Sequence, residues 1–371
     1  MEIWIINNIC VFVLSTFLAG YMIPKILLIA FAKNLYDGHD ERKIHKGAVP
    51  RLGGLAFTPV IAFSIILVLA INMAAGRQGL VNHMEQNSME MAFQFCGLTL
   101  LYLVGIADDL IGVRYSAKFY IQITCGVLLV AGGIWINNLH GLLGIGELPT
   151  IVGYALTILV IVFFTNAINL IDGVDGLASG LSIAATIVYG IAFVLLENYM
   201  YAALAFGTLG VLLPFFYYNV FGNVDKGKKI FMGDTGSLTL GFILSLLSIK
   251  LLHSSQTIQP TNLNPFVLAF APMLIPCLDV LRVFFRRIRH HKSPFLPDRT
   301  HIHHKLMAVG FTSRVTMVSI VGFSIFLTIV NLLLSQYLNV TILVVANLAG
   351  WVLLNMWITK RIHENGKEND F

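Results

Sequence analysis

Charge is scarce in this sequence. Only 12% of its 371 residues are Asp, Glu, Lys or Arg, whereas 57% are hydrophobic. Soluble domains carry about 25% charged residues, so this chain has too few to cover a surface that faces water. The shortage excludes a soluble enzyme, a disordered chain and a nucleic-acid-binding module. Lipid is therefore expected to be the main solvent of the protein.

Paired cysteines and internal repeats are also lacking. The four cysteines, Cys10, Cys96, Cys125 and Cys277, lie in apolar stretches without CxxC spacing. We therefore expect neither a disulfide framework nor a zinc site. Because no repeat or linker divides the chain, residues 1–371 are expected to form a single membrane-embedded domain.

Long apolar runs are what the sequence has instead. A helix needs roughly 20 apolar residues to cross a bilayer, and about eleven runs qualify. They cover residues 3–24, 52–73, 89–107, 119–137, 151–171, 177–196, 199–221, 236–253, 263–285, 315–336 and 338–359. The first run lacks a basic flank and a cleavage site, so we expect a retained helix. The pattern predicts an all-α, polytopic integral membrane protein with about 11 transmembrane helices.

The basic residues predict an orientation. With the N-terminus outside, 22 of the 24 Lys and Arg residues fall on cytoplasmic segments, and only Arg77 and Lys250 do not. Because Lys and Arg concentrate in cytoplasmic loops, we predict an N-out, C-in topology. All eleven Asp residues fall on the same side, an asymmetry that the positive-inside rule does not explain. A functional site is therefore expected at the cytoplasmic face.

Two carboxylate motifs lie at that face. Asp108 and Asp109 are adjacent and repel one another unless a cation is near, and Lys118 is a candidate; a solvated turn is the alternative reading. In NAINLIDGVDG, Asn169 and Asp172 follow one another at i, i+3 and share a helical face, and Asp175 extends the set. Polar groups at this depth are costly unless they meet water, a ligand or one another.

A third motif, FMGDTGS, contains Asp234. This carboxylate suits a magnesium-bound phosphate, although a helix cap is a common alternative for Asp before a helix. Just upstream, Asn219 and Phe231 offer an amide and a ring for a base, with packing as the other possibility.

Two cationic motifs complete the set. PFLPDRTHIHHKL combines imidazole and guanidinium groups that suit anionic phosphate oxygens. Zinc binding and attraction to anionic lipid are the alternatives for this loop. HKGAVPRLGG adds two cations before paired glycines. The candidate phosphate-binding residues of the two motifs are Arg299, His301, His303, His304, Lys46 and Arg51. Carboxylates for magnesium beside cations for phosphate indicate phosphoryl or phospho-sugar transfer.

Taken in order, these motifs resemble those of the polyprenyl-phosphate N-acetylhexosamine-1-phosphate transferases, over nearly the whole chain. PRLGG, the Asp pair with a downstream Lys, NxxNxxDGxDGLA, FMGDTGS and HIHHKL carry the resemblance. HIHH with PRLGG is most similar to the branch that uses UDP-N-acetylglucosamine (UDP-GlcNAc) for O-antigen lipopolysaccharide, common-antigen or teichoic-acid linkage lipids. The resemblance implies transfer of GlcNAc-1-phosphate to undecaprenyl phosphate, with release of UMP, in the bacterial inner membrane.

The resemblance also implies residue roles. Asp108, Asp109 and Lys118 would lie near the polyprenyl phosphate. The cofactor would be Mg²⁺, with Mn²⁺ as an alternative, held by Asp234 with Asp172 and Asp175 as further ligands. The residues on the uridine and metal side of the site would be Asn169, Asp172, Asp175, Asn219 and Phe231. Those that hold the sugar-phosphate would be Arg299, His301, His303 and His304.

Three alternatives stay open at this point. The same reaction with another UDP-N-acetylhexosamine is one, and with UDP-MurNAc-pentapeptide another. An ion-coupled transporter would place its polar residues near the bilayer midplane in broken helices, whereas the motifs here lie at helix ends. The expected partners are the two substrates and membrane lipids, without nucleic acid, and a homodimer is an open alternative to a monomer.

Overall fold

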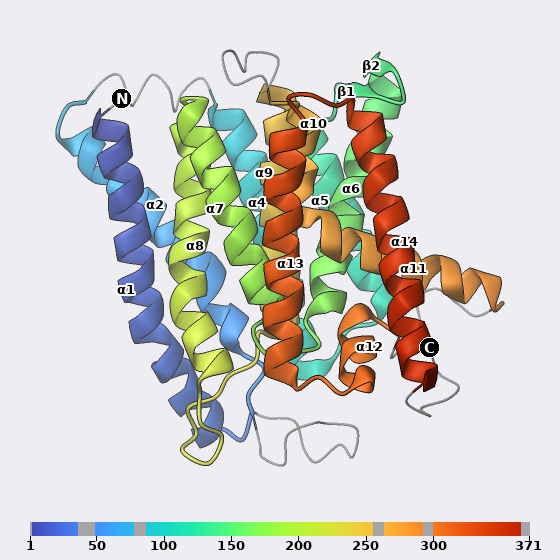
Figure 1. The fold of residues 1–371 in the computed structure, drawn as a ribbon. Helices are drawn as coiled ribbons and strands as arrows, with labels where there is room; N and C mark the ends of the chain where they lie inside the picture. Colours follow the sequence, from blue (N-terminus) through green and yellow to red (C-terminus); the bar gives the residue numbers. More distant parts are fainter. Residues whose placement is uncertain (1, 36–48, 78–86, 255–262, 292–299, 365–371) are drawn as a thin grey trace.

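The computed structural model describes residues 2–35, 49–77, 87–254, 263–291 and 300–364. Within these ranges, ten helical segments are long and apolar enough to cross a bilayer, and they run side by side as one bundle (Figure 1). They are α1 (Glu2–Ala32), η1 with α2 (Gly53–Ala56 and Phe57–Ala74), α4 (Ser88–Ile111), α6 (Thr150–Ile171), α7 (Leu177–Leu195), α8 (Tyr199–Val220), α9 (Gly233–Ser254), α10 with η3 and α11 (Pro265–Phe270, Ala271–Met273 and Leu274–Arg289), α13 (Ser313–Leu334) and α14 (Val340–Glu364). The predicted all-α, polytopic membrane architecture is confirmed.

Two of the predicted spans differ in detail. The fourth was expected at 119–137, but its helix, α5 (Tyr115–Ala131), has 17 residues and ends before Gly132 and Gly133. The ninth, expected as one helix over 263–285, is broken into α10, η3 and α11. Pro272 lies in η3, at the break, and α11 then turns away from the bundle axis (Figure 1). At the break the Ala269 carbonyl accepts hydrogen bonds from Tyr189 and Ser248, at 2.7 and 2.8 Å. Such partners are what allow an interrupted helix inside a membrane.

A β-hairpin between α5 and α6 was not predicted. Strand β1 (Asn138–Leu142) pairs antiparallel with β2 (Ile145–Glu147), with Asn138 opposite Glu147. It lies at the end of the bundle where α1 begins (Figure 1). We call this the hairpin end, and the opposite end, which carries Asp108 and Asp234, the aspartate end.

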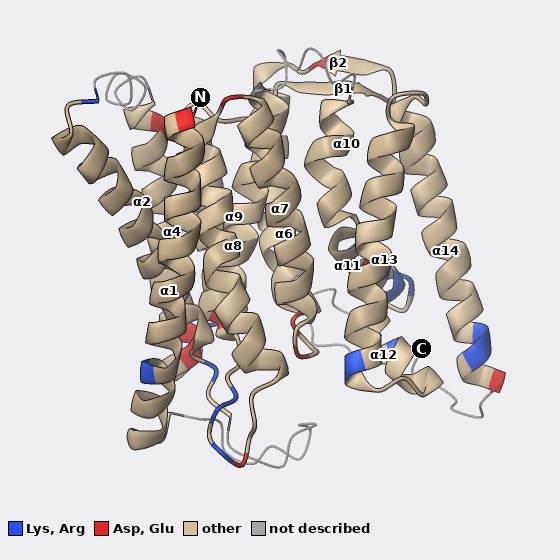
Figure 2. Cartoon of the chain, turned by 60° about the vertical axis from the view of Figure 1, so that its left-hand side comes forward, with Lys and Arg blue, Asp and Glu red and all other residues tan. Residues whose placement is uncertain are grey.

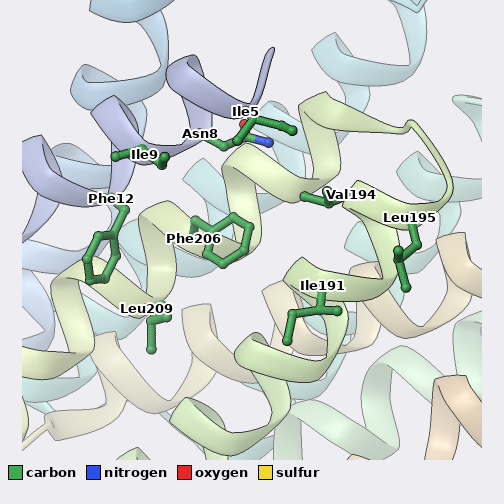
Figure 3. Close-up of a pocket in the computed structure, with 9 residues that line it drawn as sticks. All are labelled: Ile5, Asn8, Ile9, Phe12, Ile191, Val194, Leu195, Phe206 and Leu209. Atoms are coloured by element: carbon green, nitrogen blue, oxygen red, sulfur yellow. The ribbon is translucent and has the colours of Figure 1, made fainter. Parts of the chain in front are cut away.

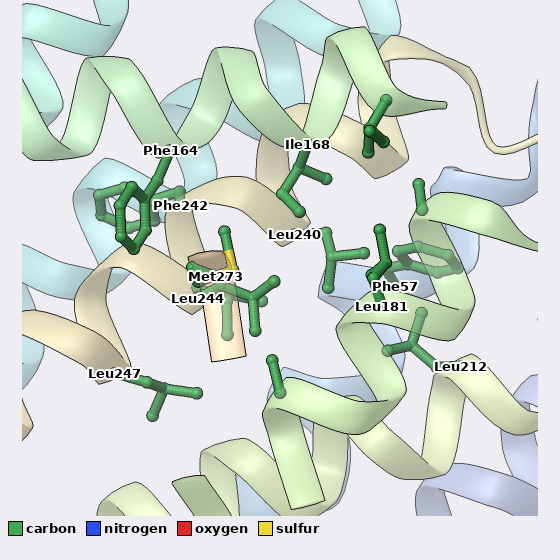
Figure 4. Close-up of a cluster of buried hydrophobic side chains, with 14 of the residues drawn as sticks. Phe57, Phe164, Ile168, Leu181, Leu212, Leu240, Phe242, Leu244, Leu247 and Met273 are labelled. Atoms are coloured by element: carbon green, nitrogen blue, oxygen red, sulfur yellow. The ribbon is translucent and has the colours of Figure 1, made fainter. Parts of the chain in front are cut away.

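Helix α9 lies at the centre of the bundle and is enclosed along its membrane-spanning length. Its apolar side chains Leu240, Phe242 and Leu244 pack with Phe164 of α6 and Phe57 of α2 (Figure 4). An all-round apolar helix of this kind belongs in a core. It therefore fixes the position of its first turn, where Asp234 lies.

Glycines let the neighbouring backbones approach the start of α9. A Cβ built on Gly105 of α4 would lie 2.4 Å from the Thr235 Cα, and one built on Gly54 would lie 2.0 Å from the Gly236 nitrogen. No side chain fits there, so the second glycine of PRLGG is explained by packing. Small residues that allow close helix contact are typical of membrane bundles.

Helices α4 and α9 run antiparallel and are joined near both ends. At the hairpin end, Lys250 of α9 donates to Glu90 of α4 at 2.6 Å and lies over the Tyr201 ring, 4.9 Å from its centroid. At the aspartate end, the Asp109 side chain of α4 accepts hydrogen bonds from the first turn of α9. Together with the glycine contacts, these bonds fix the register of the two helices.

The Gly105 contact gives a direct test of this packing. We expect Gly105→Ala to lower the thermal unfolding midpoint in detergent, because overpacking a close contact costs about 1–3 kcal/mol. Gly350→Ala is the matched control, since a Cβ built there meets nothing within 4 Å and alanine favours a helix over glycine. Equal midpoints for the two variants would contradict the close approach of α4 and α9.

Charged side chains are divided unequally between the two ends. Among the described residues, Lys and Arg gather in the half of the bundle that holds the aspartate end (Figure 2), apart from Arg77 and Lys250. The chain begins α1 at the hairpin end and finishes α14 at the aspartate end (Figure 1), as expected for an odd number of crossings, here the ten long segments together with the shorter α5. The N-out, C-in orientation stays a prediction, with the aspartate end as its cytoplasmic side.

Candidate active site

The site is built around the first turn of α9. Before it, residues 231–232 pair with residues 50–54 through backbone hydrogen bonds. The Phe231 nitrogen donates to the Pro50 carbonyl, and the nitrogens of Gly53 and Gly54 donate to the carbonyls of Phe231 and Met232, at 2.8–2.9 Å. The PRLGG and FMGD motifs, about 180 residues apart in sequence, are therefore one structural unit.

Asp109 caps α9. Its carboxylate accepts hydrogen bonds from the backbone nitrogens of Asp234 and Thr235, at 2.7 and 2.9 Å, and from the Thr235 hydroxyl at 2.6 Å. A helix begins with unpaired N–H groups and a partial positive charge, both of which a carboxylate satisfies. Asp109 thus has a structural role at the start of α9, and its hydrogen-bond partners differ from those of its neighbour Asp108.

Lys118 joins Asp108 to Asp234. Its ammonium nitrogen lies 2.9 Å from Asp108 Oδ2 and 2.7 Å from Asp234 Oδ2. The second Asp234 oxygen accepts from the Asn169 amide at 3.0 Å, and the same amide also donates to Ser237 at 2.8 Å. The predicted cation beside the Asp pair is therefore present, and it also reaches the FMGD carboxylate.

Asp172 follows the last residue of α6 and has a different environment. No hydrogen bond to its carboxylate is found among the described residues. Burial raises its pKa well above the ordinary value, and the negative charges of Asp234 and Asp175 raise it further, while Arg51 opposes them. A carboxylate in this setting gains stability from any cation that approaches.

Asp175 and Asn219 hold the turn between α6 and α7. Asp175 forms an ion pair with Lys229 at 2.6 Å. The Asn219 amide accepts from the Gly176 nitrogen at 2.6 Å and donates to the Ile230 carbonyl at 2.9 Å. Asn219 is buried, and both ends of its amide are bonded to backbone. The structure thus gives it a positioning role at the turn, and its predicted contact with uridine stays a prediction.

The histidine motif meets the same turn from the other side. His303, in α12 (Ile302–Val309), is 1% exposed, and its Nε2 would lie 2.4 Å from a Cβ built on Gly173. Its ring is parallel to that of His301, with centroids 5.8 Å apart. Burial and the neighbouring His304 lower the pKa of His303 to about 3, so this ring is neutral at physiological pH.

Asp279 of α11 is a site residue that the sequence did not single out. It is fully buried and bonds to His301, Ile302 and Arg282. The available signal was a lone carboxylate in an apolar helix, which is costly without partners. Lys305 adds a second anchor: it donates to Thr359 of α14 at 2.8 Å, and burial lowers its pKa to about 8.

The remaining predicted residues vary in placement. Lys46 and Arg299 lie outside the described residues. Arg51 is exposed and close enough to Asp172 to affect its charge. Phe231 and His304 are half-buried, and the ring of His304 lies 4.2 Å from that of His303. Predicted substrate contacts of these residues stay predictions.

The carboxylates of the site are the groups that could bind a metal ion. In the described parts of the chain, no three carboxylate, imidazole or thiol groups converge as a ready-made metal cage. Mg²⁺ is usually held by one or two carboxylates together with substrate phosphates and water, so a complete cage is not required. Asp172, whose carboxylate has no hydrogen-bond partner among the described residues and lies beside the charge of Asp234, fits such an ion.

Two apolar cavities lie elsewhere. One is enclosed by α1, α7 and α8 and is lined by Ile5, Phe12, Ile191, Phe206 and Leu209 with four neighbours (Figure 3). The other lies between α2, α4, α8 and α9. Neither includes a carboxylate or histidine of the site, so the polar cluster is a separate feature at the aspartate end.

Carboxylates, a bridging lysine and packed imidazoles at one end of an apolar bundle define a class, the integral-membrane enzymes that act on phosphate-bearing substrates at the bilayer surface. The chain belongs to glycosyl transferase family 4, which residues 91–252 match. That segment contains the Asp pair, NAINLIDGVDG and FMGDTGS. The resemblance inferred from the sequence is confirmed.

Relatives extend the match over most of the chain. It is 31% identical over 322 residues to the probable undecaprenyl-phosphate N-acetylglucosaminyl 1-phosphate transferase of Bacillus subtilis (strain 168), covering 86% of this chain and 83% of the relative. It is 32% identical to the decaprenyl-phosphate N-acetylglucosaminephosphotransferase of Mycolicibacterium smegmatis, covering 81% and 75%. The undecaprenyl-phosphate alpha-N-acetylglucosaminyl 1-phosphate transferase of Yersinia pestis is 29% identical, covering 79% and 74%.

Proposed function

We propose that this protein transfers GlcNAc-1-phosphate from UDP-GlcNAc to undecaprenyl phosphate, at the cytoplasmic face of a bacterial inner membrane. The observation that carries the proposal is the Lys118 bridge between Asp108 and Asp234, with Asp172 close by. This cluster lies at the end of the bundle, where a lipid phosphate and a water-soluble donor can both reach it. The names of the relatives support the acceptor and the sugar.

The reaction exchanges one phosphoanhydride for another. An oxygen of the lipid phosphate forms a bond to the sugar-bearing phosphorus of UDP-GlcNAc, and the bond from that phosphorus to the bridging oxygen breaks. UMP leaves with that oxygen, and undecaprenyl-diphosphate-GlcNAc forms. Because the bonds made and broken are of one kind, we expect a reversible reaction. Catalysis comes mainly from positioning and from neutralising phosphate charge.

Residues of this chain supply those two effects. Lys118 would bind the lipid phosphate, and a phosphate oxygen would compete with Asp108 and Asp234 for its ammonium group. His301, His303 and His304 would bind the sugar-phosphate, across the Gly173 turn from the carboxylates. Asp172 and Asp234 would hold Mg²⁺, which neutralises diphosphate charge when bound. Asn169 keeps Asp234 oriented.

The direct test is a transfer assay. Purified protein with labelled UDP-GlcNAc, Mg²⁺ and undecaprenyl phosphate should give a labelled, organic-extractable product and UMP, and added UMP should reverse the reaction. UDP-GalNAc and UDP-MurNAc-pentapeptide, tested in parallel, report the alternative donors. Absence of lipid product with every donor would reject the proposal. Uptake of a solute by proteoliposomes would instead favour the transporter, although the polar cluster at the helix ends supports the enzyme.

The proposed orientation has its own test. In a background without the four native cysteines, Ser116→Cys and Lys226→Cys report the aspartate end, and Gly146→Cys reports the hairpin. A membrane-impermeant thiol reagent should label Gly146→Cys in sealed cells and the other two only after permeabilisation. The opposite pattern would invert the topology and place the site outside the cytoplasm.

A further inference from the structure

The carboxylate of Asp279 is the polar centre of the α11–α12 junction. Its side chain is fully buried. One oxygen, Oδ2, accepts from His301 Nδ1 at 2.8 Å, and the other accepts from the Ile302 nitrogen and from Arg282, both at 3.0 Å. A single carboxylate thus binds one histidine of the HIHH motif and the first backbone nitrogen of α12.

Arg282 completes the junction. The same guanidinium nitrogen that bonds to Asp279 also donates to the Thr300 carbonyl. Thr300, His301 and Ile302 are therefore held to α11 by two side chains, those of Asp279 and Arg282. Because an arginine–carboxylate pair inside a protein is rigid and charge-assisted, the backbone that leads into the histidine motif has one position relative to α11.

These contacts determine which nitrogen of His301 is free. A carboxylate accepts but does not donate, so Nδ1 carries the hydrogen and donates it to Asp279. Nε2 takes part in no hydrogen bond among the described residues. The ring is parallel to that of His303, within 4°. Nε2 carries no hydrogen and is left to accept a hydrogen bond from a ligand.

We propose that Asp279 is a positioning residue for the sugar-nucleotide donor, acting by fixing the ring and the tautomer of His301 so that Nε2 accepts a hydrogen bond from a hydroxyl group of the donor sugar. The inference rests on the proposed function, because it takes the histidine motif as the donor site. Asp279 itself lies behind His301 and touches no substrate. Its role resembles that of the outer groups that orient metal-binding or catalytic histidines in other proteins.

Asp279→Asn separates this role from simple anchoring. An asparagine oxygen still accepts from Ile302 and Arg282. The amide nitrogen that replaces Oδ2 can only donate, so Nδ1 of His301 must become the acceptor and the ring hydrogen moves to Nε2. The variant keeps the shape of the junction and reverses one hydrogen bond.

The experiment is a double-mutant cycle on the full-length protein in detergent or nanodiscs. The variants are Asp279→Asn, His301→Ala and the double variant, with kcat and KM measured separately for UDP-GlcNAc and undecaprenyl phosphate. We expect each single variant to lose at least about tenfold in kcat/KM for UDP-GlcNAc, with KM for the lipid unchanged. The double variant should lie within about twofold of His301→Ala, since residues that act as a unit are not additive.

Thr359→Val is the matched control. It removes the shorter of the two hydrogen bonds from Lys305 that tie α12 to α14, without touching His301, and its effect should multiply with that of His301→Ala. The proposal would be overturned if the loss in kcat/KM for Asp279→Asn multiplied with that for His301→Ala in the double variant. Equal changes in KM for both substrates would also overturn it. If Asp279→Asn does not fold, Asp279→Glu is measured instead. Because glutamate keeps an acceptor for Nδ1, kcat/KM for UDP-GlcNAc should stay within about threefold of the wild type, and a tenfold loss in a folded Asp279→Glu variant would overturn the proposal.

Failure of this proposal is distinguishable from failure of the proposed function. An active wild-type protein with an additive cycle rejects the role of Asp279 alone. A wild-type protein that forms no lipid-linked product rejects the proposed function. In that case the same four proteins are titrated with UDP-GlcNAc by calorimetry: non-additive losses in affinity support the role of Asp279, and additive losses or absence of UDP-GlcNAc binding reject it.

Discussion

Replacing Asp172 by Asn should abolish nearly all transfer and at the same time stabilise the metal-free protein. The carboxyl group is half-buried beside Asp234 and Asp175, and its pKa is raised well above the ordinary value. Folding therefore disfavours the ionised form of this group, and the amide removes that cost. Activity should fall by about a hundred- to a thousandfold, the loss typical when one preorganised electrostatic group is removed.

The pH dependence gives the sign of this effect. A carboxyl group whose pKa is higher in the folded than in the unfolded protein lowers the free energy of unfolding, and it does so fully when the pH is above the folded-state pKa. The loss shrinks as the pH falls through that pKa, because the folded protein then takes up a proton. The stability advantage of Asp172→Asn over the wild type should thus shrink on acidification. Mg²⁺ should raise the unfolding midpoint of the wild type and have less effect on the variant. A variant less stable than the wild type at pH 7 without metal, or one with normal activity, would contradict the assignment.

The second large effect is expected at Asp109. Asp109→Ala removes the acceptor of two backbone N–H groups and one hydroxyl at the start of α9. Each buried donor left without a partner costs about 1–3 kcal/mol. We therefore expect a clear drop in the thermal unfolding midpoint. Activity should fall with it, because the first turn of α9 carries Asp234.

Asp108→Asn is the comparison within the same pair. Asp108 accepts from Val113 and Lys118 and takes no part in the cap, so its loss should reduce turnover with little change in stability. Unfolding curves and transfer rates for the two variants, collected side by side, check this division. If Asp108→Asn unfolds as readily as Asp109→Ala, the two carboxylates share one role.

Hydropathy and motif order predicted much of this protein because the bilayer restricts what a chain can do. Only helices or closed barrels satisfy the backbone in lipid, so eleven apolar runs sufficed for the architecture. The grouping of Asp108, Lys118, Asp172 and Asp234 at one end followed from their places at helix ends. Candidate phosphate-binding residues were proposed from residue type alone, since cations and carboxylates rarely gather in such a chain without a function, and their contacts with phosphate stay predictions.

What escaped prediction depends on contacts between distant segments. Nothing local distinguishes Asp108 from Asp109; the difference arises from the register of α4 against α9. Asp279 had no spacing signature, because its partner His301 lies beyond the α11 helix. The break at Pro272 and the early end of α5 before Gly132 changed two of the predicted spans, because proline and glycine there end helices that hydropathy alone continues.

The double attachment of α4 to α9 has a mechanical consequence. With an ion pair at one end, a helix cap at the other and glycine contacts between, these helices behave as one stiff body. The wall of the site that they form cannot yield to admit a bulky prenyl chain or a nucleotide sugar. A substrate must therefore fit these two helices as they stand, and any adjustment on binding has to come from elements that are not tied to them in this way.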